Sequence, residues 1–238
     1  MSTSTWLITG SSRGLGLEIV RQLIRSPANL VIATCRNPAN ATALQALKSD
    51  AKGPLHIIPL DVSDPNSIRS SVKTVGDILG EQGLDYLYNN AGITPGPEAA
   101  FDFEYSALLE TLQVNIAAPA LISQVYLPLV EKSNRKVIVN VSSALGSLAL
   151  NTWGSVQSVY SVTKAGLNML TKKQANAKPD LIVITVSPGW TKTGKYMGGS
   201  DATLEPYESV EGQLKLVKGL TLQDSGKFFD QTGGILPW

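Results

Sequence analysis

The two side chains whose types and spacing suit acid–base chemistry are Tyr160 and Lys164, four residues apart. A helix would place residues i and i+4 on one face, roughly 5–6 Å apart at Cβ. A lysine ammonium close to a phenol favours the phenolate, because an opposite charge stabilises the charged form. A free tyrosine titrates near pH ~10, so a decrease of about two to three units in its pKa would make it an efficient acid or base. The pair is a candidate catalytic group, although this spacing also occurs without any function.

A glycine-rich run near the N-terminus could hold a phosphate. It follows a short apolar stretch, precedes an amphipathic one and has the spacing Gly-x-x-x-Gly-x-Gly. Glycines let the backbone approach a ligand closely, and the N-terminus of the helix that follows favours an anion. We interpret the run as a dinucleotide-binding turn, although a strand-to-helix turn that needs positive φ would look the same. The residues expected to hold the cofactor here are Gly10, Ser12, Arg13, Gly14, Leu15 and Gly16.

The end of the second expected strand indicates which dinucleotide binds. An acidic residue near this point holds the ribose 2′-hydroxyl of NAD, whereas arginine accommodates the 2′-phosphate of NADP. The strand ends at Arg36 and Asn37, with no acidic residue, and Arg13 lies in the preceding turn. The sequence therefore predicts NADP(H) in preference to NAD(H). The alternative is that both arginines are solvated surface charges that bind no phosphate.

These side chains need a scaffold, and short β-branched or apolar runs alternate with longer amphipathic segments along the chain. The expected strands are Trp6–Thr9, Asn29–Cys35, Leu55–Leu60, Leu84–Tyr88, Lys136–Val141 and Leu181–Val186, with Phe228 and Phe229 in a last one. The expected helices are Leu15–Arg25, Ala39–Lys48, Pro65–Leu79, Phe103–Val130 and Gly154–Gln174. This alternation predicts an α/β fold, a Rossmann-type doubly wound parallel sheet with helices on both faces.

The chain length suits one domain of this class. We expect residues 1–238 to form it, with a cofactor-binding half at about 1–115 and a catalytic and substrate-binding part at about 116–238. The polar segment Gly194–Pro206 is interpreted as a mobile surface segment rather than a domain boundary.

Composition excludes several classes of partner. A net charge of +1 gives no sign of a nucleic-acid or membrane-surface partner. Cys35 is the only cysteine and His56 the only histidine, so we expect neither a disulfide framework nor a metal site. The N-terminus lacks a charged region followed by an apolar one, and we see no apolar run near the ~20 residues of a membrane span. We expect a soluble cytoplasmic protein.

Motifs spread along residues 5–195 resemble those of the short-chain dehydrogenase/reductase family. They are the glycine turn, Asp61 and Val62 after the third strand, Asn90, Ala91 and Gly92 after the fourth, Asn115 in a helix, Ser142 and Ser143 after the fifth strand, Tyr160 with Lys164, and Pro188, Gly189, Thr191 and Thr193 after the sixth. The tail 226–238 resembles the branch that holds sniffer-type carbonyl reductases and fungal norsolorinic acid ketoreductases.

The resemblance implies hydride transfer between a nicotinamide and a carbonyl or alcohol carbon. Tyr160 would exchange a proton with the substrate oxygen, and Lys164 would lower the tyrosine pKa and hold the nicotinamide ribose. Ser143 would donate a second hydrogen bond to that oxygen, where negative charge builds up during carbonyl reduction. Asn115 would position a water that links Lys164 to solvent. The cofactor turn, Asp61 with Val62, the segment 90–92 and the 188–193 loop would hold NADP(H).

Three serines are candidates for this role. The family usually has about thirteen residues from this serine to the tyrosine, whereas Ser143 and Tyr160 are seventeen apart, and thirteen residues back from Tyr160 is Ser147. We favour Ser143 because it directly follows the expected strand and Gly146 stands three residues on. Ser142 and Ser147 stay open, and the extra residues would form a loop beside the substrate.

Other functions fit the sequence less well. A serine hydrolase would use the Gly-x-Ser-x-Gly match at 10–14, but no histidine follows late in the chain. A non-enzymatic NADP sensor could share the fold, although such proteins often lose the tyrosine or the lysine, and both are present. We expect a small carbonyl or alcohol substrate, bulky or aromatic if Trp153, Trp190 and Tyr196 border its pocket. By analogy with the family, we expect a homodimer or homotetramer.

Overall fold

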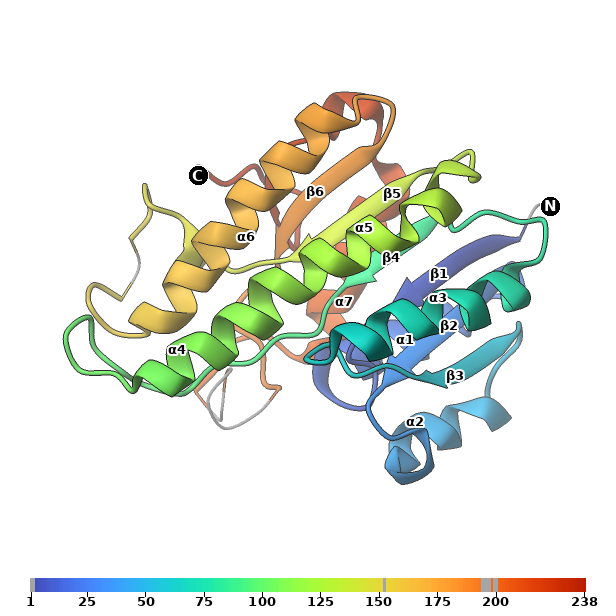
Figure 1. The fold of residues 1–238 in the computed structure, drawn as a ribbon, viewed down its shortest axis with the longest axis horizontal. Helices are drawn as coiled ribbons and strands as arrows, with labels where there is room; N and C mark the ends of the chain where they lie inside the picture. The colour runs from blue at the N-terminus through green and yellow to red at the C-terminus, as the bar shows by residue number, and fades with distance from the viewer. Residues whose placement is uncertain (1–2, 152, 194–197, 199–200) are drawn as a thin grey trace.

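A computed structural model describes residues 3–151, 153–193, 198 and 201–238, which fold around one central sheet (Figure 1). All its strand pairs are parallel, in the order β3-β2-β1-β4-β5-β6-β7. The strands are β1 (Ser4–Ile8), β2 (Asn29–Cys35), β3 (Leu55–Pro59), β4 (Tyr86–Asn89), β5 (Val137–Val141), β6 (Ile182–Ser187) and β7 (Phe228–Asp230). The predicted doubly wound α/β fold is therefore confirmed.

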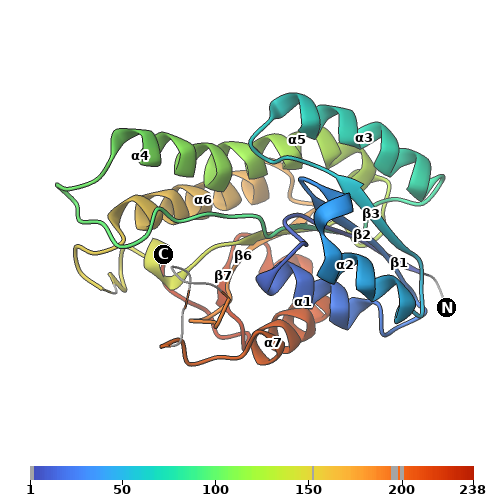
Figure 2. The same ribbon diagram turned by 90° about the horizontal axis from the view of Figure 1, so that it is seen from below.

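Helices cover both faces of the sheet, as Figure 2 shows: α3, α5 and α6 lie on one side, α1, α2 and α7 on the other. The helices are α1 (Gly14–Leu23), α2 (Thr42–Ala46), α3 (Pro65–Leu79), α4 (Tyr105–Leu112), α5 (Ala118–Glu131), α6 (Ser158–Ala177) and α7 (Pro206–Gly219). Short 3₁₀ turns lie at Pro38–Asn40, Leu47–Ser49, Ala144–Gly146 and Leu222–Asp224, and a π-helical segment at Gln113–Ala117 joins α4 to α5.

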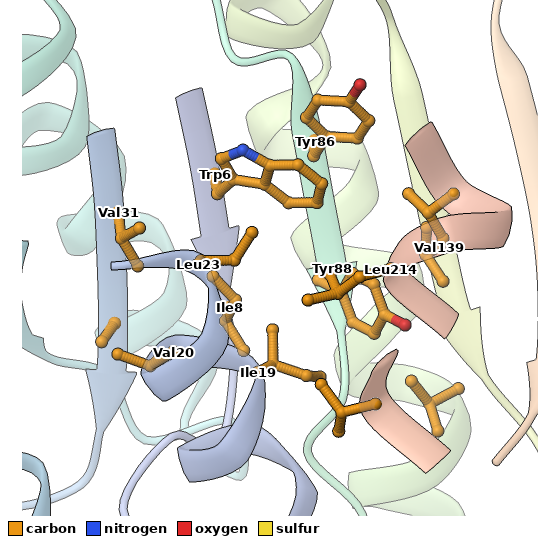
Figure 3. Packing of buried hydrophobic residues seen from close by; sticks show 14 of the residues in the cluster. Trp6, Ile8, Ile19, Val20, Leu23, Val31, Tyr86, Tyr88, Val139 and Leu214 are labelled. Carbon is orange, nitrogen blue, oxygen red and sulfur yellow. The ribbon is translucent and has the colours of Figure 1, made fainter. Parts of the chain in front are cut away.

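Two apolar cores, one on each face, follow from the alternation of side chains along the buried strands. Trp6 and Ile8 of β1 enter the core beneath α1 and α7, whereas Leu7 enters the core beneath α3 and α5. In the first core Trp6 stacks on Tyr86, with ring centroids 3.7 Å apart (Figure 3). Because both faces of the sheet are buried, the strand sequences are continuous apolar runs. Packing on both faces also fixes the relative positions of the carboxyl ends of the strands.

The observed helices differ from the expected ones in three places. The helix expected over Phe103–Val130 is interrupted by the π-helical segment, and that expected over Ala39–Lys48 reduces to the five residues of α2 between two 3₁₀ turns. There the Asn37 side chain accepts a hydrogen bond from the Asn40 amide and starts a separate turn. Helix α7 was not expected at all.

The signals for α7 were present in the sequence. Pro206 lies in its first turn, and a capping box joins Glu205 and Glu208. Its buried apolar residues Val210, Leu214 and Val217 follow the spacing of a helix that covers one core.

The stretch Tyr105–Glu131 is long and apolar enough to cross a membrane by length and composition alone, which differs from our expectation that no run approaches this length. Its second part, α5, packs against the sheet, where Ile122, Tyr126 and Val130 are buried. Packing therefore accounts for the apolar character of α5. Among the described residues, no group of three or more His, Cys, Asp or Glu side chains could hold a metal ion.

Candidate active site

The loops that follow β1, β4, β5 and β6 converge at one edge of the sheet, near the start of α6 (Figure 1). In open α/β sheets ligands bind outside the carboxyl ends of the strands, where the strand order reverses, and here it reverses between β1 and β4. A cavity of about 280 Å³ lies there. It is lined by Leu15, Thr94, Ser142, Ser143, Ala144, Leu145, Trp153, Gln157, Tyr160, Ser187, Pro188, Gly189, Trp190, Thr191 and Thr193.

Tyr160 and Lys164 occupy successive turns of α6, as their spacing predicts. Tyr160 lines the cavity, whereas Lys164 is buried behind it at 3% exposure. The Lys164 Nζ donates a 2.8 Å hydrogen bond to the Val141 carbonyl at the end of β5, and it lies 5.4 Å from the centroid of the Tyr160 ring. The ammonium is therefore fixed between the sheet and the phenol.

Burial is the main influence on the pKa values of Tyr160 and Lys164. It raises the pKa of the Tyr160 phenol above its usual range, and a hydrogen bond to Ser143 opposes that rise. It also lowers the pKa of the Lys164 ammonium to about 8. The expected lowering of the tyrosine pKa by Lys164 stays a prediction, because burial and the Ser143 hydroxyl are the influences that act on the Tyr160 pKa here. Tyr160 is thus protonated at neutral pH, in the form that can donate a proton.

The three candidate serines have different surroundings. Ser143 lines the cavity, and its hydroxyl is hydrogen bonded to Tyr160 and accepts from the Leu145 amide. Ser142 is buried, and its hydroxyl donates to Asn168 Oδ1 at 2.6 Å. Ser147 is also buried and donates to the Pro237 carbonyl at 2.8 Å. Of the three, Ser143 is the serine whose hydroxyl acts on the pKa of the phenol, and its catalytic role stays a prediction.

Asn115 lies in the π-helical segment and is 1% exposed. Its side chain accepts from the Ile93 amide at 2.9 Å, donates to the Ile93 carbonyl at 2.9 Å and donates to Thr163 Oγ1 at 3.0 Å. A Cβ on Gly92 would lie 3.3 Å from Asn115 Oδ1 and 3.5 Å from Lys164 Nζ. Asn115 therefore ties the segment after β4 to α6 close to the lysine. Its proposed role in positioning water stays a prediction.

The glycine turn packs against the segment that follows β4. Gly10 has φ +69°, and a Cβ there would lie 3.0 Å from Ala91 Cα. A Cβ on Gly16 would meet the Gly10 carbonyl and lie 2.6 Å from Asn90 Nδ2. The Asn90 amide group donates to the Thr9 carbonyl at 2.9 Å. Backbone contact thus leaves no room for side chains at two of the three glycines, and the turn presents main chain to a ligand.

Charged groups border this turn. Arg13, directly before α1, and Arg36, after β2, are both exposed. Asp61 accepts from the Ser63 hydroxyl at 2.7 Å; this bond, a second from the Ser63 amide and the charge of Arg36 hold the pKa of Asp61 low despite partial burial. Val62 borders a small crevice that Ala91 also lines. Arg36 is thus close enough to Asp61 for the two charges to interact.

The loop after β6 closes the cavity from the opposite side. Gly189 has φ +74°, and a Cβ there would lie 2.5 Å from Leu204 Cδ1. The Thr191 hydroxyl donates to the Pro188 carbonyl at 3.1 Å. A Cβ on Gly14 would lie 3.5 Å from Thr193 Cβ, so this loop touches the glycine turn. Tyr196 and part of the predicted mobile segment, residues 194–197, 199 and 200, lie outside the described residues.

The lengthened loop between Ser147 and Gln157 supplies an aromatic wall. Asn151, Trp153 and Gln157 all have positive φ, which side chains other than glycine rarely adopt. Trp153 meets Trp190 edge to face where both line the cavity, with ring centroids 5.5 Å apart. The loop is fixed at its base, because the Ala149 amide donates to the Trp238 carbonyl at 3.0 Å.

Several residues at the site were not predicted, and three of them make polar contacts beside Tyr160. Thr94 and Gln157 line the cavity, and the Thr94 hydroxyl donates to Gln157 Oε1 at 3.1 Å. Glu98 contacts the first turn of α6. Gln157 is the N-cap residue of α6 and has a left-handed backbone conformation, so helical spacing from Tyr160 does not give its position. No sequence signal marks Glu98, because its contact joins residues about sixty positions apart.

Known proteins resemble this chain over its whole length. The sequence model of the family described as short chain dehydrogenase matches residues 4–201. The short chain dehydrogenase gsfK of Penicillium aethiopicum is 32% identical over 250 residues and covers 99% of both chains. Two solved structures cover 100% of both chains: the NADPH-bound carbonyl reductase from chicken fatty liver, at 34% identity and TM-score 0.92, and the carbonyl reductase Sniffer of D. melanogaster, at 31% identity and TM-score 0.93. Sequence and fold therefore point to the same group of proteins.

Proposed function

The chain belongs to the short-chain dehydrogenase family, and on that premise we propose that it is an NADPH-dependent reductase that interconverts a ketone or aldehyde and its alcohol. Membership of the family makes it an oxidoreductase, and the similarity to carbonyl reductases supports a carbonyl substrate. The observation that carries the proposal is the cluster of Ser143, Tyr160 and Lys164 at one cavity.

The residues around the cavity fit a nicotinamide dinucleotide. The glycine turn offers main chain that side chains would block, and α1 starts directly behind it, where an anion is stabilised. Gly92 leaves space beside Asn115 and Lys164. The turn at 10–16, Asp61 with Val62, the segment 90–92 and the 188–193 loop would hold the cofactor, which when bound supplies the hydride.

In the proposed reduction, Tyr160 gives its proton to the oxygen of the substrate as charge develops there. Its raised pKa keeps that proton on the phenol at neutral pH. Ser143 donates to the same oxygen, and Lys164 stabilises the phenolate that forms, from its fixed position at Val141. Proton donation and a second hydrogen bond act at the atom where negative charge grows.

Replacing Tyr160 by phenylalanine tests the assignment, because it removes one oxygen and leaves the ring. General acid catalysis contributes about 10²–10⁴-fold, so we expect kcat to decrease by at least ~100-fold while NADPH binding is retained. Turnover is followed as NADPH oxidation with a panel of ketones and aldehydes, and binding by isothermal titration. A variant that kept most of the wild-type kcat would overturn the role of Tyr160. Wild-type protein that bound NADPH but reduced no carbonyl would favour a dinucleotide sensor.

We propose that the protein prefers NADPH to NADH. Arginines, and no acidic residue, lie where side chains would contact the 2′-position of the ribose. Arg36 and Arg13 could both pair with a 2′-phosphate, each charge-assisted bond contributing roughly 1.5–3 kcal/mol. We therefore expect kcat/KM for NADPH to exceed that for NADH by at least ~10-fold. The two values, measured with one ketone, decide the preference. Equal values would remove Arg36 and Arg13 from cofactor recognition.

The cavity favours a bulky or aromatic carbonyl compound. Trp153 and Trp190, in contact with each other, both line it, and both keep about half of their surface exposed. A planar substrate could pack against these rings, an arrangement that adds to simple burial.

Assembly and location are also proposals. Leu109 of α4 and Val162 and Met169 of α6 are exposed apolar side chains on helices that lie side by side. These residues support a homo-oligomer formed through this face, and sedimentation velocity would show its size. Cytoplasmic localisation rests on the sequence alone.

A further inference from the structure

We propose that Glu98 is a positioning residue that holds Tyr160 in place for the proton transfer described above, so this inference rests on the proposed reductase activity. Helix α6 begins at Ser158, and Tyr160 is only its third residue. The first N–H groups of any α-helix have no partner within the helix, and the first turn frays unless something else accepts their hydrogen bonds. The proposed acid therefore stands on the least secure turn of its own helix.

Helix α6 lacks the side-chain N-cap that normally accepts these hydrogen bonds. A side chain at the N-cap normally accepts from the second or third N–H group. Here the N-cap is Gln157, which has φ +62° and makes no side-chain cap bond; its Oε1 instead accepts from the Thr94 hydroxyl. The first backbone bond of the helix runs from the Ser161 amide to the Gln157 carbonyl at 2.8 Å, so it does not involve the amide of Tyr160.

Glu98 takes the place of the cap from a different part of the chain. Its Oε1 accepts from the Val159 amide at 2.6 Å and, more weakly, from the Tyr160 amide at 3.4 Å. Its carbonyl accepts from the Gln157 amide at 2.9 Å. The loop before α4 that carries it runs beside the start of α6 (Figures 1 and 2). Two amides in the first turn of α6, and the amide of the N-cap residue before it, thus depend on one remote residue.

The second carboxylate oxygen of Glu98 shows that this contact is partly unfavourable in free energy. Glu98 Oε2 is buried and has no hydrogen-bond partner among the described residues. Buried polar atoms are nearly always paired, so an unpaired one calls for an explanation. A negative charge at the N-terminus of a helix is favourable, and this interaction offsets the free energy lost by leaving Oε2 without a hydrogen bond. A neutral acceptor would provide the same hydrogen bonds without a buried charge.

The position of Tyr160 matters because its partners lie on other elements. Ser143 follows β5, and Lys164 is bound to the Val141 carbonyl at the end of that strand. Movement of the first turn of α6 would separate the phenol from Ser143 while leaving Lys164 in place. A misplacement of about 1 Å can cost about 10²-fold in rate. Glu98 is therefore expected to affect kcat rather than the binding of the cofactor, whose proposed site is elsewhere.

The test compares Glu98→Ala and Glu98→Gln with Asp224→Ala. Asp224 is the control, because its carboxylate also accepts from a backbone amide, that of Thr221, and pairs with Lys227. It directly precedes β7, whereas the cavity is lined by segments that follow their strands. For each variant, kcat and KM for NADPH and for one ketone are measured with the melting temperature. We expect Glu98→Ala to lower kcat about 10- to 100-fold with KM for NADPH within about twofold. Glu98→Gln, which keeps the acceptor oxygen, should recover kcat to within about threefold of wild type.

The control separates positioning from stability. Asp224→Ala should lower the melting temperature by an amount similar to Glu98→Ala and leave kcat unchanged. A Glu98→Ala kcat within twofold of wild type, an equal loss of kcat in Asp224→Ala, or a Glu98→Gln variant as slow as Glu98→Ala would each overturn the proposal. If Glu98→Ala does not fold, Glu98→Asp is measured instead. Its shorter carboxylate cannot reach the same amides, so it should also lower kcat. Wild-type protein without turnover would instead refute the proposed function.

Discussion

Two segments that border the same cavity are built in opposite ways. The glycine turn at 9–16 reaches positive φ only at glycines and presents main chain, because neighbouring backbone excludes side chains. The loop at 147–157 reaches positive φ at Asn151, Trp153 and Gln157 and presents large side chains to the cavity and to solvent. The first is suited to a ligand held by main-chain groups, and the second to a ligand recognised by side chains. A substitution should therefore damage cofactor binding in the turn and change substrate preference in the loop.

The largest effect should come from Gly16→Ala in the turn. The new methyl would meet the Gly10 carbonyl and lie 2.6 Å from Asn90 Nδ2, so the turn must open. We expect NADPH affinity to decrease at least ~100-fold and the free energy of unfolding to decrease by roughly 1–3 kcal/mol, as in other overpacked sites. Titration calorimetry and urea unfolding measure the two quantities.

Gly76→Ala is the matched control for this variant. Gly76 lies inside α3, and a Cβ there has nothing within 4 Å. Alanine is the better helix former, so this change should raise the free energy of unfolding by roughly 0.5–1 kcal/mol. A Gly16→Ala variant that bound NADPH like wild type would show that the turn is not made by backbone contact.

A smaller and more selective effect is expected from Trp153→Ala in the loop. Loss of the edge-to-face contact with Trp190 removes one wall of the cavity. KM should rise about 10-fold for a bicyclic aromatic ketone, and KM for NADPH and for a small aliphatic ketone should stay within about twofold. Trp153→Phe should retain most of the aromatic preference. Equal changes for both ketones would show that the loop does not select the substrate.

The smallest expected effect concerns Lys164, which lies between the two segments. Burial lowers its pKa from 10.5 to about 8, so between these values the unfolded chain holds more protons at this residue than the folded protein. The free energy of unfolding therefore rises with pH across this window, by on the order of 1–2 kcal/mol from pH 8 to 9.5. Urea unfolding of the protein without cofactor should show this rise in wild type and not in Lys164→Met. Parallel pH profiles would mean that Lys164 is not desolvated.

The sequence predicted the parts of the molecule that depend on short-range patterns. The strand runs and the Tyr160–Lys164 spacing lie within single elements, and the structure confirms the sheet and the shared helical face. Family membership confirms the resemblance that rested on the motifs. The roles assigned to the individual site residues stay predictions.

Features that depend on long-range contact could not be predicted in this way. The pKa of Tyr160 rises because several loops bury the phenol, and no spacing reports burial of that kind. The bonds between Glu98 and α6 join residues that are distant along the chain. The π-helical segment that carries Asn115 interrupts a helix whose apolar pattern gives no sign of the break.

The four tryptophans are distributed so that the protein carries its own optical reporters. Trp6 is completely buried and stacked on Tyr86 between the central strands, so its emission would change only when the sheet comes apart. Trp153 and Trp190 stand half exposed at the cavity, where a ligand would alter their contact with water. One fluorescence spectrum should thus contain separate signals for unfolding and for occupancy of the cavity, without any attached dye.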